Sequence, residues 1–170
     1  MGWLPTLLVE HSALVPLGVL VVVVGSGALG WVGRKSPRVL GWLVGLTLLG
    51  VLAVTLAPDD RGRVREVTCE VGVDFPSWGS SELLANVALF VPVTVFAVVR
   101  FRRPVLVALG GILLSAVIEG TQALAVVLGR SCTTSDWAMN TAGTVLGVGV
   151  GAALLVLDRT RAGRAGAAPR

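Results

Sequence analysis

Polar side chains that could do chemistry occur at helical spacing inside three otherwise apolar stretches of the sequence. They are Glu82 and Asn86 in SELLANVALFVP, Ser115, Glu119 and Gln122 in SAVIEGTQ, and Asp136 and Asn140 in SDWAMNTAG. Residues three, four or seven apart share one side of a helix, so each set is expected to line a single helix face. Carboxylates can accept and donate protons, and amides can donate and accept hydrogen bonds, so these faces suit a polar ligand.

Glu119 is the residue that packing explains least. It lies within a long apolar run, and a charge at the centre of a bilayer costs at least about 2.5 to 3.5 kcal/mol on insertion scales. Such a carboxyl either pairs with a cation, such as Arg130 in the following loop, or stays neutral. Both states are typical of functional sites, so the sequence predicts a functional role for Glu119.

A structural alternative stays open for the other polar residues. Asn86 and Asn140 could join helices by hydrogen bonds without any ligand. Asp136 and Glu82 could each cap the N-terminus of a helix by accepting free backbone N–H groups. These roles would make the motifs a matter of packing alone.

Metal ions, cofactors and a Ser/His nucleophile are not predicted. His11 is the only histidine, and Cys69 and Cys132 show no close ligand spacing. Carboxylates alone leave calcium or magnesium as a weaker alternative. The serines inside the apolar runs, such as Ser26 and Ser115, have no histidine base near them in the sequence. The net charge of +4 comes from short basic clusters between apolar runs, which argues against nucleic acid as a partner.

The elements that position these residues are predicted to be membrane-spanning helices. Of the 170 residues, 54% are hydrophobic and 14% are charged, whereas roughly a quarter are charged in soluble proteins. A span needs about 20 mainly apolar residues, which makes the lipid bilayer the expected surroundings of the chain. The qualifying runs are roughly Ser12 to Val32, Val39 to Ala57, Leu83 to Val99, Pro104 to Leu128 and Trp137 to Leu157. The sequence predicts an all-α bundle of five spans in one domain, residues 1–157, followed by a disordered basic tail, residues 158–170.

The polar faces are predicted to converge, because the three helices that carry them are consecutive in the chain. Together with Arg130 they are expected to form one pocket open toward the outer leaflet. Gly143, Gly147 and Gly151 continue the face of Asp136 and Asn140 at four-residue spacing. Small residues at this spacing let helices approach closely, so this face is predicted to be buried against a neighbour.

The basic residues predict the orientation of the bundle. Ten of the 14 Lys and Arg residues follow the first, third and fifth spans, and four lie in the loops on the opposite side. The positive-inside rule makes the side with ten residues cytoplasmic. The N-terminus is therefore expected outside and the C-terminus inside.

The two cysteines both fall in loops on the predicted outer side. An oxidising compartment and an even number of cysteines favour a disulfide between Cys69 and Cys132. Two unrelated thiols are the alternative, since the sequence does not show that their Cα atoms come within about 7 Å.

At these residues the sequence resembles the VanZ-like family of bacterial membrane proteins. The resemblance rests on NVALFVPVTVF, SAVIEGTQ and GRSCTTSDWAMNTAGTVLG, and covers residues 82–151. The residues that it carries over are Asn86, Phe90, Pro92, Ser115, Glu119, Gln122, Arg130, Asp136, Asn140, Gly143 and Gly147. Thr94 departs from the family, which usually has Gly at this place after its Pro, and the cysteines are not part of the general pattern.

The resemblance implies a place in the bacterial cytoplasmic membrane and a role at the cell envelope. The family is named for a protein that raises resistance to the glycopeptide antibiotic teicoplanin, so a link to antibiotic resistance is also implied. The biochemical activity of the family is not established. The resemblance therefore suggests a family without a mechanism.

Three functions fit these residues. The first is noncatalytic binding of a lipid-linked envelope component or a lipidated glycopeptide, with Arg130 on a phosphate or carboxylate and the amides donating hydrogen bonds. The second is an intramembrane enzyme that acts on a lipid-linked substrate, with Glu119 and Asp136 as acid and base. The third is a small transporter or flippase that uses Glu119 as a protonatable gate. The sequence leaves this choice and the oligomeric state open.

Overall fold

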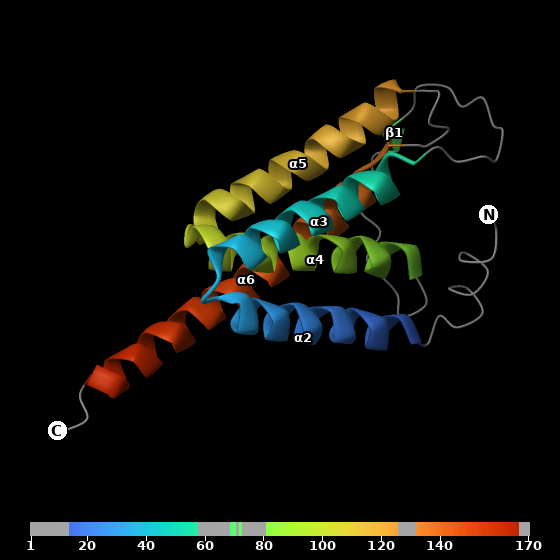
Figure 1. Ribbon diagram of the computed structural model, residues 1–170. Helices are drawn as coiled ribbons and strands as arrows, with labels where there is room; N and C mark the ends of the chain where they lie inside the picture. The colour runs from blue at the N-terminus through green and yellow to red at the C-terminus, as the bar shows by residue number, and fades with distance from the viewer. Residues whose placement is uncertain (1–13, 58–68, 71, 73–80, 126–131, 167–170) are drawn as a thin grey trace.

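The computed structural model describes residues 14–57, 69–70, 72, 81–125 and 132–166 of the chain (Figure 1). The helices in these ranges are α2 (Val15–Gly33), α3 (Pro37–Thr55), α4 (Ser81–Phe101), α5 (Pro104–Leu124) and α6 (Thr134–Gly166). All five are long and apolar enough to cross a membrane. This confirms the predicted all-α bundle of five spans. The predicted orientation, with the N-terminus outside and the C-terminus inside, stays a prediction.

The starts of three helices follow from proline. Pro16, Pro37 and Pro104 stand in the first two positions of α2, α3 and α5, where a missing N–H costs no helical hydrogen bond. Ser36 also caps α3, since its Oγ accepts a hydrogen bond from the Val39 N–H at 3.5 Å. The breaks between apolar runs are thus encoded locally.

Helix α4 lies at the centre of the bundle. Half of the residues in its most apolar 18-residue stretch are buried, whereas 11% of the residues in the corresponding stretch of α2 are buried. It packs against α2, α3 and α6, whereas α5 packs chiefly against α6. Large apolar side chains such as Leu20, Leu46 and Leu113 are exposed on the outer helices. In a membrane these side chains face lipid, which is as apolar as they are.

The contact between α4 and α6 depends on the glycine face of α6. A Cβ atom at Gly147 would lie 2.7 Å from the carbonyl oxygen of Val91, and one at Gly151 would lie 2.7 Å from Cβ of Val98. Gly143 meets the α4 backbone in the same way. The predicted burial of this face against a neighbouring helix is confirmed.

Helix α6 extends to Gly166, so the prediction of a disordered tail is wrong for residues 158–166. Asp158 pairs with Arg34 at 3.1 Å and with Arg102 at 3.2 Å. One turn later, Arg161 lies over a tryptophan ring of α2, 4.8 Å from its centroid. These contacts give the basic segment folded partners, which its composition does not reveal.

Two short strands lie where α6 begins. β1 (Cys69–Glu70) and β2 (Cys132–Thr133) form a parallel pair in which Cys69 is opposite Cys132. The pair joins the segment between α3 and α4 to the segment between α5 and α6. The first residues of α6 are thereby fixed against β1, and the N–H of Gly72 adds a hydrogen bond to Oγ1 of Thr134 at 2.8 Å.

Candidate functional site

One face of α5 carries the three polar residues singled out from the sequence into the protein. Ser115 is fully buried, and Glu119 and Gln122 are each 6% exposed. Gly111 and Ile118 lie on the same buried stripe. The predicted sharing of one helix face by these polar residues is therefore confirmed, and Glu119 does not face lipid.

A chain of hydrogen bonds connects Glu119 to the other two helices. Oε2 of Glu119 accepts from the N–H of Thr133 at 3.2 Å, and Oγ1 of Thr133 accepts from the N–H of Asp136 at 3.0 Å. Oδ1 of Asp136 accepts in turn from Nδ2 of Asn86 at 2.5 Å. The four residues, which we call the polar network, come from α5, β2, α6 and α4. The structure thus brings Glu119, Asp136 and Asn86 together.

Thr133 is the member of the polar network that the sequence interpretation missed. It is the N-cap of α6, because its hydroxyl accepts from the third helical N–H. Asp136, considered above as a cap, instead lies in the first helical turn, where its charge suits the helix dipole. The preference of Thr for N-caps was the available signal, but only the fold shows that its own N–H reaches Glu119.

A second group of polar atoms lies between α5 and α6. Ser115 and Thr144 are fully buried and Asn140 is 2% exposed, yet Oγ of Ser115, Oγ1 of Thr144 and Oδ1 of Asn140 have no hydrogen-bond partner among the described residues. We call these three residues the polar seam. Buried polar atoms are nearly always paired with protein, water or ligand. The seam therefore calls for a polar partner.

The register of the two helices joins the seam to the polar network. Figure 1 shows that α5 and α6 run in opposite directions. They touch at Gly111, where an added Cβ would lie 2.6 Å from Cγ2 of Thr144. One turn along each helix from this contact come Ser115 and Asn140, and a further turn brings Glu119 and Asp136 to the same level.

Gln122 has a different neighbour from the one predicted. Its Nε2 donates to the carbonyl oxygen of Thr55 at 2.7 Å. Thr55 is the last residue of α3, and the final carbonyls of a helix have no partner within it. Gln122 thus ties α5 to α3, and no hydrogen bond among the described residues joins it to the polar network.

Several predicted residues lie outside the part of the chain that the structure describes. They are Arg130 as a whole and the side chains of Glu82, Cys69 and Cys132. The backbones of the two cysteines are opposite each other on paired strands. Paired strands lie about 4.7 to 4.9 Å apart, within the Cα separations of about 4.4 to 6.8 Å that disulfides span. The disulfide itself stays a prediction.

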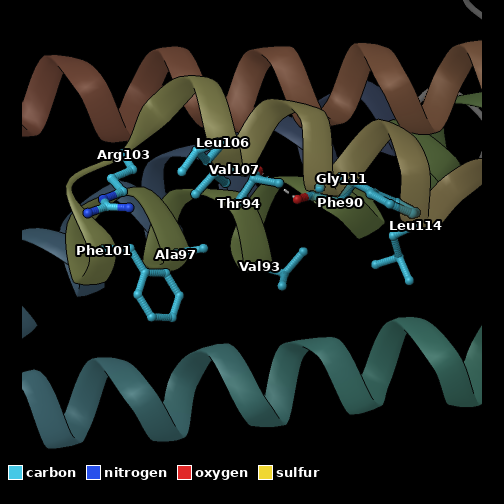
Figure 2. A pocket seen from close by; sticks show the side chains of 11 residues that line it. Phe90, Val93, Thr94, Ala97, Phe101, Arg103, Leu106, Val107, Gly111 and Leu114 are labelled. Atoms are coloured by element: carbon cyan, nitrogen blue, oxygen red, sulfur yellow. Dashed lines mark hydrogen bonds between the residues drawn. The ribbon is translucent and has the colours of Figure 1, made fainter.

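The bundle also holds an apolar cavity of about 480 Å³ between α4 and α5 (Figure 2). None of the polar residues singled out from the sequence whose side chains the structure describes lines it. It lies along the half of α5 that begins at Pro104, whereas Glu119 and Gln122 lie toward the other end. The cavity and the polar network are separate features of the bundle.

A comparison with protein families gives a match that covers most of the described helices. A family model described as VanZ/LLP1 matches residues 47–156, about two thirds of the sequence. The matched range contains the whole polar network and the whole polar seam. No match was found among curated proteins or among solved structures.

Proposed function

The chain belongs to the VanZ/LLP1 family and is a multi-pass membrane protein, and on that basis we propose that it binds an amphiphilic envelope component. The ligand would carry a head rich in hydroxyl, amide or phosphate groups on an apolar chain. A lipid-linked envelope precursor and a lipidated glycopeptide both have this chemistry. The proposed contacts are the polar seam and the polar network beside it, with Arg130 supplying a positive charge.

The observation that carries the proposal is the unpaired polar seam. The three oxygens of the seam lie on facing helices and lack partners among the described residues, as does Oγ1 of Thr141 on α6, within a bundle that exposes many large apolar side chains. In a membrane such atoms cannot exchange freely with bulk water, and each unsatisfied group is costly. A ligand head that inserts there would gain hydrogen bonds that lipid tails cannot offer.

Mass spectrometry of lipids that copurify with the protein tests this proposal. The full chain is extracted in mild detergent, and bound amphiphiles are identified and quantified against the protein. Asn140→Leu keeps the branched shape of the side chain but removes its polar atoms, and should lower the captured amount about tenfold, because a ligand hydrogen bond is lost in a dry site.

Thr121→Val on α5 is the matched control. Thr121 is exposed and its hydroxyl bonds only to the Val117 carbonyl of its own helix, so capture should stay unchanged. Equal capture by the wild type, Asn140→Leu and Thr121→Val would contradict the proposal. Capture of bulk lipid alone by the wild type would contradict it too.

A second candidate function is intramembrane catalysis, favoured by the connection of Glu119 and Asp136 through Thr133. Two linked carboxyl groups could act as general acid and base on a lipid-linked substrate. Glu119→Gln keeps hydrogen bonding but cannot ionise. It should spare binding and abolish any conversion of the captured lipid, as followed by mass spectrometry in purified membranes.

The proposed site also gives a test of the link to antibiotic resistance. If the protein protects cells by binding a lipidated glycopeptide, expression in a susceptible bacterium should raise the inhibitory concentration of teicoplanin. It should not raise that of vancomycin, which has no acyl chain. Loss of the effect in Asn140→Leu, with the membrane level of the protein unchanged, would assign protection to the polar seam.

We propose that Cys69 and Cys132 form a disulfide that holds β1 against β2. The support is their opposite placement on the paired strands. A free-thiol count of two in denatured, nonreduced protein would rule the bond out. A count of zero that becomes two on reduction is expected.

We also propose that the N-terminus lies outside the cell and the C-terminus inside, from the distribution of basic residues. Lys35→Cys and Gly163→Cys, both at exposed positions, test this in a background without the native cysteines. An impermeant thiol reagent should label neither in intact cells and both after permeabilisation. Labelling of both positions in intact cells would show that the orientation is the opposite of the one proposed.

A further inference from the structure

The apolar cavity between α4 and α5 is an open groove rather than a sealed void. Phe101 and Leu106, which line it, are 54% and 57% exposed. Its volume of about 480 Å³ lies within the range of about 300 to 1,000 Å³ that is typical of small-molecule sites. Figure 2 shows Arg103 at one end of this groove and Leu114 at the other. In a membrane, the surroundings of such a groove are lipid chains.

The groove results from the way α5 packs. Helix α5 packs mainly on α6 and only lightly on α4, whose other faces are covered by α2, α3 and α6. Gly110 lies in the lining and adds no side chain, and a Cβ atom there would meet nothing within 4 Å. Its neighbour Gly111 also lies in the lining, but a Cβ atom there would lie 2.6 Å from Cγ2 of Thr144. One glycine of the pair brings α5 to α6, and the other leaves the groove unfilled.

The charged end of the groove is formed by one of two adjacent arginines. Arg102 has a φ of 58°, a left-handed conformation that is uncommon outside glycine, and it pairs with Asp158 at 3.2 Å. Asp158 also binds Arg34, so the acidic group nearest this turn is occupied by two other arginines. Arg103 lines the groove, is exposed, and its side chain makes no hydrogen bond or ion pair with any described residue.

We propose that this groove binds one acyl chain of an anionic phospholipid, with the lipid phosphate held by Arg103. The apolar lining matches a hydrocarbon chain, and the unpaired guanidinium at its end matches a phosphate, which it can bind through two parallel hydrogen bonds. Arg103 also belongs to the end of the bundle that carries Lys35, Arg38 and Arg100, where anionic headgroups are attracted. This site goes beyond the proposed function, because it shares no residue with the polar seam or the polar network.

Native mass spectrometry of the full chain tests both halves of the proposal. The probes are phosphatidylglycerol and phosphatidylcholine with identical acyl chains, added to delipidated protein. The wild type should bind one phosphatidylglycerol more tightly than phosphatidylcholine. Arg103→Gln should reduce that preference about fivefold, the usual effect of one basic residue near a membrane surface, and weaken binding of phosphatidylcholine less, because its choline cation offsets the phosphate charge.

Matched variants distinguish lipid binding in the groove from general electrostatic attraction of lipids to the basic end of the bundle. Gly110→Leu fills the groove and should weaken binding of both lipids about tenfold, because the chain loses its apolar contacts. Gly120→Leu is the control, since Gly120 is exposed on the same helix, meets nothing within 4 Å and lies outside the groove. Arg38→Gln, at an exposed position of the same basic end, controls for charge.

Two results with these variants would overturn the proposal. The first is equal binding by Gly110→Leu and Gly120→Leu, and the second is equal loss of preference in Arg103→Gln and Arg38→Gln. A phosphatidylglycerol with a photoreactive chain keeps the test independent of these variants. In the wild type its crosslinks should concentrate on residues 90–114, and an even spread over exposed side chains such as Leu20 and Leu46 would equally refute the groove. Any of these failures would leave the function proposed for the polar seam untouched.

Discussion

The two ends of α5 are built in opposite ways. At the end that carries Glu119 and Gln122, the side chains are buried and bonded to β2 and α3. At the end that begins at Pro104, the helix borders an apolar groove and an arginine that makes no pair with the described residues. The difference between the two ends follows from the lipid that surrounds the bundle. Polar groups in a membrane must find partners within the protein, whereas apolar surfaces can be left to lipid.

Two kinds of polar residue occur at and beside the buried end of α5. The polar network is joined from Glu119 to Asn86 by hydrogen bonds, so it holds helices together. The polar seam of Ser115, Asn140 and Thr144 has atoms without partners in the described part of the chain. Residues of the network should therefore matter most for stability, and residues of the seam for ligand binding.

The largest effect on stability is expected at Gly111 of α5, and its neighbour Gly110 provides the comparison. Gly111→Ala places a methyl group against Thr144. It should lower the free energy of unfolding by about 3 kcal/mol, the upper end of the usual cost of overpacking. Gly110→Ala should instead be neutral or slightly stabilising, because it adds helix propensity in open space. Unfolding by SDS titration, followed by circular dichroism, measures both. Equal effects would remove the distinction between the two faces of α5.

The next largest effect is expected from breaking the polar network. Asn86→Leu removes the part-buried hydrogen bond to Oδ1 of Asp136 and should cost about 2 kcal/mol, within the range for hydrogen bonds to charged groups. The same titration measures the loss. The double variant Asn86→Leu/Asp136→Leu should recover part of it, since both polar groups are then gone. Additive losses in the double variant would show that the two residues do not stabilise the bundle as a pair.

A smaller effect on stability is expected in the polar seam. Asn140→Leu removes a carbonyl oxygen that has no partner among the described residues, so stability should stay within about 1 kcal/mol of the wild type. The same variant is expected to lose the captured amphiphile. Thermal unfolding in detergent and lipid capture should thus respond differently. A large loss of stability would assign Asn140 to packing, which was the structural alternative for this residue.

The smallest effect is expected at the basic end of the bundle. Arg102→Gln removes an exposed ion pair to Asp158 and should cost less than about 1 kcal/mol. The difference from the wild type should shrink as salt rises from 0.05 to 0.5 M, roughly the range over which surface charges become screened. Thermal unfolding at the two salt concentrations checks this. A cost that is independent of salt would indicate that the left-handed turn at Arg102, rather than the ion pair, is what matters.

The predicted helices were close to those of the structure because their cause is local. A run of about 20 apolar residues must form a helix in lipid, whatever its neighbours are. The observed Pro37–Thr55 and Pro104–Leu124 lie within a few residues of the predicted spans. The small-residue face of α6 could be predicted for a similar reason, since four-residue spacing is visible in the sequence.

The sequence by itself determined which residues had to turn away from lipid, because the cost of exposing Glu119, Gln122 or Asn140 there does not depend on the fold. Only the tertiary structure decided what each of them meets. In the structure Glu119 accepts a hydrogen bond from the N–H of Thr133, and Gln122 donates one to the last residue of α3. Oδ1 of Asn140 has no partner in the described part of the chain. The packing of the helices also forms the groove beside Arg103 and provides the contacts of the helical segment after Asp158. These outcomes depend on helix registers and on residues far apart in the chain, which a pattern along one helix cannot contain.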